Sequence, residues 1–189
     1  MKKADVQTDR ATYRHGNLRA EAIRVGAALV AGEGHENLSI RQVAEQIGVA
    51  HRSLYNHFEN RDSLLDAVAE NAFGKLAVKL RRAESAAEFT RIYARYALKN
   101  KNNYALMTSR PHATMKNSPD LQTAVHQVIT EALRVFGHID ADPTVRRRQV
   151  MRQFMLIHGA LTLYAAGILD LPNDKALLDE LTSEPSAAH

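Results

Sequence analysis

Apolar residues recur at helical spacing along most of the chain, and no segment alternates apolar with polar positions as a strand does. One apolar stripe covers residues 22–30, a second covers 43–47, and a longer one covers 64–80. The same spacing returns in later segments, at residues 89–100, 104–107, 118–137, 142–168 and 173–181. The pattern predicts an all-α fold of about nine helices.

Residues that begin and end helices stand at the edges of these stripes. Ser39 with Gln42 predicts a capping box, and Gly48 provides the positive φ that ends a helix abruptly. Asn60 then starts a helix that we expect to reach about residue 83, roughly 35 Å at 1.5 Å per residue. Further start signals stand at Asn17, Ser118–Pro119, Asp142–Pro143 and Asn173. Residues 38–58 are therefore predicted to form two short helices joined by a tight turn.

The second short helix, residues 51–58, places only Leu54 and Phe58 on its inward side. Its other positions carry His51, Arg52, Ser53, Tyr55, Asn56 and His57. A helix that only completes a core needs few such donors, whereas a helix in a DNA major groove uses them on base edges and phosphates. The pair predicts a helix-turn-helix, although short helix pairs with a glycine turn also occur in other all-helical proteins.

The run Leu54-Tyr55-Asn56-His57-Phe58, followed by Asn60-Arg61 and a leucine-rich helix, resembles the DNA-binding domain of the TetR family of bacterial transcriptional regulators. The typical form in that family is LYxHFxxKxxLL. The resemblance covers residues 17–68 and includes the family's first helix at residues 22–34. It implies an N-terminal three-helix helix-turn-helix domain, joined by a long helix to a C-terminal helical bundle. On this basis we expect a flexible basic arm (1–16), a DNA-binding domain (17–63) and an effector-binding and dimerisation domain (64–185).

Matching positions in the motif assign DNA contacts to individual residues. His51, Arg52 and Ser53 open the recognition helix and are expected to face bases, and arginine can bind guanine through two hydrogen bonds. Arg41 is expected to reach a base or a phosphate. The residues expected on phosphates are Arg14, Ser39, Tyr55, His57 and Arg61. Asn56 stands where many relatives carry an aromatic side chain, so its partner, base or phosphate, is left open.

Composition limits the alternatives. The net charge is +4 with a pI of about 9.4, which suits nucleic acid without requiring it. The chain has no cysteine, and its nine histidines show no metal-ligand spacing. No catalytic motif is present, so we expect neither an enzyme nor a metal or other cofactor. Without an apolar leader or a membrane-length apolar stretch, the expected location is the cytoplasm.

A single recognition helix contacts too few base pairs to select one site in a genome, so we expect a homodimer on a palindromic operator in double-stranded DNA. The family resemblance places the interface on the last two long helices. The residues expected there are Val150, Phe154, Ile157, Leu161, Tyr164, Ile168, Leu177, Leu178 and Leu181. The alternative is that these side chains only complete the core of one chain.

The C-terminal domain also carries half-polar side chains typical of ligand pockets. The residues expected to line an effector pocket are Tyr93, Tyr96, Tyr104, Met107, Met115, His126, Phe154 and His158. Ile157-His158-Gly159 resembles the tryptophan-histidine-glycine signature of one C-terminal subclass of the family. The resemblance implies a repressor released by a small-molecule effector; an activator or a nucleoid-type factor of the same fold is the alternative.

Overall fold

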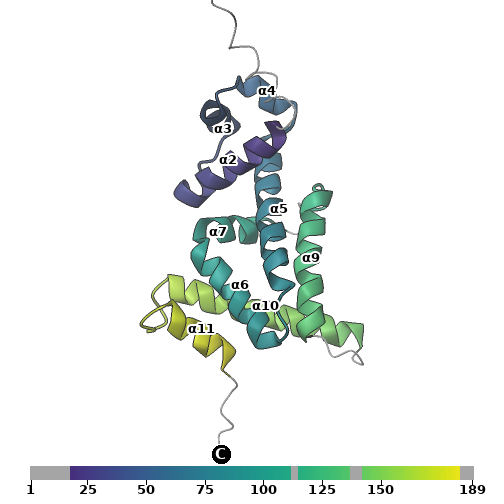
Figure 1. Cartoon of the computed structure of the whole chain (residues 1–189), viewed down its shortest axis with the longest axis vertical. Helices are drawn as coiled ribbons and strands as arrows, with labels where there is room; N and C mark the ends of the chain where they lie inside the picture. Colours follow the sequence, from purple (N-terminus) through teal and green to yellow (C-terminus); the bar gives the residue numbers. More distant parts are fainter. Residues whose placement is uncertain (1–17, 112–114, 137–141, 184–189) are drawn as a thin grey trace, which may run out of the picture.

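The computed structural model describes residues 18–111, 115–136 and 142–183, and within these residues every regular element is an α-helix (Figure 1). The first group comprises α2 (Leu18–Glu33), α3 (Ile40–Ile47), α4 (His51–Tyr55) and α5 (Arg61–Leu80). The second comprises α6 (Ala86–Lys99), α7 (Lys101–Ser109), α9 (Pro119–Phe136), α10 (Pro143–Ala165) and α11 (Asp174–Thr182). The predicted all-α fold is confirmed.

Local sequence explains where these helices begin. The Ser39 hydroxyl accepts a hydrogen bond from the Gln42 amide at 3.1 Å and caps α3, as predicted. The capping box is not completed there, because the Gln42 side chain donates to Glu33 at 3.0 Å instead. A full capping box forms at α5, where Asn60 and Ser63 each accept from the other's amide. The cap expected at Asn17 lies outside the described residues.

α5 is the helix around which the molecule is built. It leaves the N-terminal helices and runs between α9 on one side and α6 and α7 on the other (Figure 1). Its inward side is an unbroken row of buried side chains from Leu64 to Leu80. The Tyr96 hydroxyl ties α6 to this helix by donating to the Ala72 carbonyl at 3.0 Å. The two ends of the molecule are therefore joined by one continuous helix.

Two clusters of buried apolar residues form the core. The first lies under α2, α3 and α4, but it also takes in Leu106, Met115 and Leu121 from beyond α5. The second joins the far part of α5 to α6, α10 and α11. The boundary expected between residues 63 and 64 therefore does not separate two independent cores.

No helix among the described residues combines the length and the apolar character that a membrane crossing requires.

Candidate nucleic-acid interface

The turn between α3 and α4 is fixed by backbone bonds. Gly48 has a φ of +78°, and its amide bonds to the Ala44 and Glu45 carbonyls at 2.9 and 3.1 Å. The Val49 amide follows by bonding to the Ala44 carbonyl at 3.0 Å. A residue with a Cβ would be strained at this φ, so glycine allows the chain to reverse within two residues.

α4 ends at Tyr55, three residues earlier than the predicted helix, and it is anchored by Leu54 within it and by Phe58 just after it. Leu54 is 0% exposed and Phe58 2%, and both belong to the first core cluster. Arg19 lies over the Phe58 ring at 5.8 Å and covers it from the α2 side. Burial of these two apolar side chains fixes how the short helix can rotate, because any turn about its axis would expose them. The opposite side of α4 must then face outward.

That outward side carries the residues expected to contact DNA. Tyr55 is 52% exposed, and His51 lies edge-on to its ring with centroids 6.3 Å apart. His51, Arg52, Asn56 and His57 are also exposed, whereas Ser53 is half-buried. No hydrogen bond or ion pair within the described residues holds the Arg52 guanidinium. The arrangement leaves a cationic, donor-rich surface of the kind that enters a major groove.

Two expected contacts flank α4 on α3. The Ser39 oxygen already accepts the Gln42 amide, so its hydroxyl hydrogen remains to donate. Arg41 pairs with Glu45 at 3.0 Å, and both side chains are strongly exposed, 81% and 66%. An ion pair this exposed contributes little and does not prevent Arg41 from reaching a phosphate. Arg14 lies outside the described residues.

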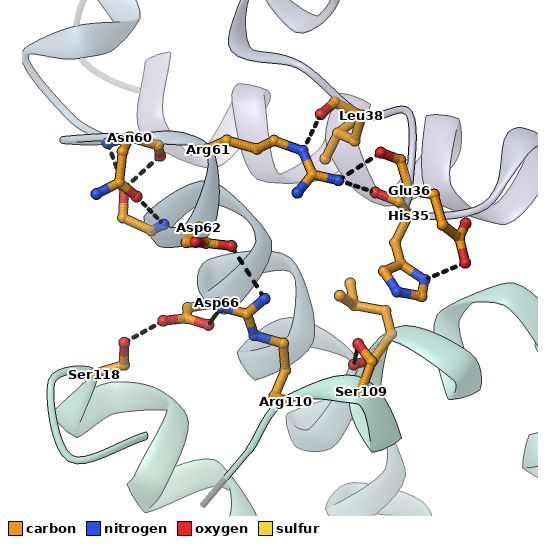
Figure 2. A network of polar contacts seen from close by, with 12 residues as sticks. His35, Glu36, Leu38, Asn60, Arg61, Asp62, Asp66, Ser109, Arg110 and Ser118 are labelled. Carbon is orange, nitrogen blue, oxygen red and sulfur yellow. Dashed lines mark hydrogen bonds and ion pairs between the residues drawn. The ribbon is translucent and has the colours of Figure 1, made fainter. Parts of the chain in front are cut away.

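Arg61 makes contacts within the chain that the sequence did not predict. Its Nε donates to the Leu38 carbonyl at 2.7 Å, and its Nη2 donates to the carbonyls of His35 and Glu36 at 2.6 and 2.7 Å (Figure 2). These bonds tie the loop between α2 and α3 to the first turn of α5. Only Nη1 is left without a partner among the described residues. The main contacts of the Arg61 side chain therefore stabilise the fold, and only Nη1 is available for a phosphate. A planar five-donor group explains why arginine makes all three bonds at once.

A second network on α5 was not predicted. Arg110, which follows α7, pairs with Asp66 at 2.6 Å and with Asp62 at 3.3 Å (Figure 2). The Arg110 and Asp66 side chains are only 11% and 15% exposed. Ser118, expected to cap α9, donates its hydroxyl to the Asp66 carboxylate instead. Partners 44 to 52 residues apart leave no periodic signal in a sequence, so only the tertiary structure reveals this network.

The described residues line a larger and a smaller cavity outside the helix-turn-helix. The larger has a volume of about 980 Å³ and lies along α5, with walls from α6, α7 and α9. The smaller, about 260 Å³, lies between α10 and the α6–α7 corner. In the smaller cavity the Tyr104 hydroxyl and His158 Nδ1 are 3.0 Å apart. Burial raises the pKa of the Tyr104 hydroxyl, so it stays protonated at neutral pH.

The residues expected to line one effector pocket are distributed over several places. Tyr104 and His158 line the smaller cavity, and Tyr96 lines the larger. Phe154 stacks on His158 at 5.7 Å but is 42% exposed. The remaining residues line neither cavity: Tyr93 and Met107 are in the second core, Met115 is in the first core, and His126 is exposed. Helical spacing could not distinguish a tyrosine or methionine in a core from one in a cavity.

The predicted dimer residues lie in three different environments within one chain. Four of them are buried in the core of the chain itself: Ile157, Leu161, Leu177 and Leu178. Three others, Val150, Tyr164 and Leu181, are half-buried against that core. Only Phe154 and Ile168 are exposed, at 42% and 67%. Periodicity identified these positions as apolar but could not identify which surface covers them.

An apolar surface nevertheless exists on α10 and just beyond it. We call it the α10 apolar face, and it comprises Met151, Phe154, Met155, Leu156, Leu163 and Ile168, each between 40% and 67% exposed. A run of large apolar side chains on one helix is unusual for a surface that meets only water.

No group of three or more acidic or histidine side chains is arranged to hold a metal ion within residues 18–111, 115–136 and 142–183.

Comparison with known proteins places this geometry among bacterial regulators. Residues 22–68 match the model described as bacterial regulatory proteins, tetR family, and residues 86–184 match the tetracyclin repressor-like C-terminal domain. The tetracycline repressor protein class C of Escherichia coli is 44% identical over 52 residues. That match covers 28% of this chain and 24% of the length of that repressor.

Solved structures resemble the whole chain. A protein of unknown function from Rhodococcus sp. RHA1 superposes with a TM-score of 0.71 and 29% identity, over 89% of this chain and 94% of that one. A tetR-family transcriptional regulator from Streptomyces coelicolor superposes with a TM-score of 0.66 over 88% of this chain and 78% of that one. Its identity of 14% shows the shared fold alone. With the C-terminal model covering more than half of its length and the N-terminal model covering the helix-turn-helix, the chain belongs to the TetR family of bacterial transcriptional regulators.

Proposed function

We propose that the chain is a sequence-specific DNA-binding regulator, a repressor that leaves its operator when a small molecule binds the C-terminal helices. One observation carries the proposal: the buried pair Leu54 and Phe58 fixes α4 so that Arg52 and its neighbours face outward. In this proposal His51, Arg52 and Ser53 contact bases, and Tyr55 and His57 contact phosphates. Asn56 and Arg41 are also exposed and add contacts to bases or phosphates.

In this proposal Arg61 has a structural role in place of the phosphate contact expected from the sequence. Its Nε and Nη2 are engaged with the loop carbonyls, so we assign it to holding α3 in place rather than to a phosphate. Only Nη1 remains for DNA. The regulator acts in the cytoplasm and needs no catalytic residue, since binding alone blocks or permits transcription.

The α10 apolar face supports pairing of two chains. Covering Met155 and Leu156, which are 59% and 55% exposed, with the same face of a second copy removes them from water. A two-fold interface of this kind presents two α4 helices to one duplex, about 34 Å apart for half-sites one turn apart. The dimer therefore explains why a five-residue recognition helix suffices.

Selection from a random pool of duplex DNA tests the proposal. The purified full chain is expected to enrich an inverted repeat at moderate salt, and sedimentation of the protein alone is expected to give a dimer. The position of the enriched repeat relative to a promoter then separates a repressor from an activator. Salt-sensitive retention of all duplexes without enrichment would contradict sequence-specific reading and favour a nucleoid-type factor.

A further inference from the structure

The larger cavity has an uneven distribution of charge. Near the α2 end of the cavity, Glu70 of α5 lies close to Asp120 of α9. Burial of Glu70, and after it the charge of Asp120, raises the pKa of Glu70. Further along α5, Lys75 and Lys79 line the same cavity, together with Arg82 just after the helix. Within the described residues these three cations have no ion pair or side-chain hydrogen bond. Nine residues of helix, about 14 Å, separate Glu70 from Lys79.

Gly74 lies between the two charged ends, in the interior of the 20-residue helix α5. Glycine is among the least favourable residues in a helix interior. A Cβ placed on Gly74 meets no atom within 4 Å, so no close packing requires a glycine there. The missing side chain instead leaves the floor of the cavity open.

A neutral polar group completes the lining. Asn103 lines the cavity, and its Oδ1 is shielded from solvent and has no hydrogen-bond partner among the described residues. A buried carbonyl oxygen without a donor is costly, and a donor on a bound molecule would satisfy it once the Asn103 amide turns toward the cavity. The lining thus offers cations for an acid and acceptors for donor groups.

We propose that this cavity is the effector site and that its ligand is an elongated molecule with an acid group, a carboxylate or a phosphate, at one end and hydrogen-bond donors or an amine at the other. The acid lies on Lys75 and Lys79 of α5 and on Arg82 just after it, and the donors lie on Glu70, Asp120 and Asn103. A volume of about 980 Å³ suits a ligand larger than a simple anion. That this ligand regulates DNA binding rests on the proposed function.

The cavity is also placed to affect DNA binding. Ala27 of α2 and Val68 of α5 line its upper end. Beside them α2 and α5 pack closely, because a Cβ on Gly26 would lie 3.1 Å from the Val68 side chain. A ligand at this end of the cavity therefore lies beside the α2–α5 contact, which determines how α2 packs on α5.

Calorimetry on the full chain tests the ligand class without DNA. The probes are trialanine, with a carboxylate and an amine, adenosine 5′-monophosphate, with a phosphate and neutral donors, and the single-ended controls hexanoate and hexylamine. We expect trialanine and adenosine 5′-monophosphate to bind more tightly than hexanoate. Hexylamine is expected to bind most weakly of the four. Hexylamine binding as tightly as trialanine, or no acid binding at millimolar concentration, would overturn the proposal.

Substitutions then locate the site. Lys75→Gln and Lys79→Gln are each expected to weaken the acid probes about fivefold, whereas Arg95→Gln on the exposed side of α6 and Lys116→Gln leave binding unchanged. Gly74→Leu fills the floor and is expected to abolish binding while raising Tm, so loss of binding is not loss of fold. Unchanged binding in Gly74→Leu would place the ligand elsewhere.

A second readout separates the two proposals. Adding the tighter probe to the protein on its selected duplex is expected to release the DNA, and to fail in Gly74→Leu. Probe binding by a protein that retains no duplex would refute the regulator and leave the ligand class standing. Duplex retention with no probe binding would refute the ligand class alone.

Discussion

In the first turns of α5, Arg61, Asp62 and Asp66 are bound to other parts of the chain, whereas Lys75 and Lys79 near its end have no partner within the described residues. The first group joins the helix-turn-helix to the rest of the molecule. The second group faces a cavity. One helix therefore uses charge at one end to hold the fold together and at the other end to remain available for a ligand. The following substitutions test that difference.

The largest effect is expected from Arg110→Ala. It leaves the largely buried Asp66 carboxylate without its cation and removes the tie between α5 and the end of α7. We expect the free energy of unfolding to fall by about 2–3 kcal/mol, measured by urea denaturation. Lys79→Ala on the same helix is the control and should change stability by less than about 0.5 kcal/mol. Equal effects from the two substitutions would remove the distinction between the two ends of α5.

Arg61→Gln is expected to have an intermediate effect, about 1–2 kcal/mol, because three hydrogen bonds to the loop between α2 and α3 are lost. DNA binding distinguishes this role from the phosphate contact that the sequence predicted. If the side chain holds the loop, the slope of log affinity against log salt stays unchanged while affinity falls. A slope smaller by about one would instead show that Arg61 neutralises a phosphate.

The smallest effect is expected from Glu70→Gln. Burial, followed by the charge of Asp120, raises the pKa of Glu70 above its ordinary value of 4.5. The folded state therefore binds this proton more tightly than the unfolded state, and the group lowers stability as pH rises through and above that range. The variant should be more stable than the parent at pH 7, by less than about 1 kcal/mol after allowance for solvent screening. The gain should vanish towards pH 4 in urea titrations.

A loss of stability in Glu70→Gln at pH 7 would contradict this account. It would mean that Arg19, whose charge lowers the pKa of Glu70, outweighs burial and Asp120.

Local signals in the sequence predicted the helices and the shape of α3–α4 well. Ser39, Gly48 and Asn60 act on neighbouring backbone, and the apolar residues Leu54 and Phe58 are both buried as predicted, although α4 ends at Tyr55. What the sequence could not provide was the partner of a side chain far along the chain. Ser118 was expected to cap a helix and bonds Asp66 instead.

The same reason applies to the predicted pocket and dimer residues of the C-terminal helices. Ile157 and Leu177 are as apolar as an interface residue, and their spacing does not reveal that the chain's own second core covers them. His126, by contrast, is exposed and lines neither of these two cavities. Burial and cavity lining are properties of packed helices, so they appear only when the helices are placed relative to one another.

The reading of bases by α4 is tested most directly by comparing Arg52→Ala with Tyr55→Phe on the selected duplex and on single-base variants of it. The account predicts that Arg52→Ala costs about 1–3 kcal/mol on the best site and reduces discrimination at the base pair that Arg52 contacts. Tyr55→Phe should weaken binding about equally on all sites, because a phosphate contact carries no sequence information. Unchanged site preference in Arg52→Ala would show that the outward side of α4 is not the base-reading surface.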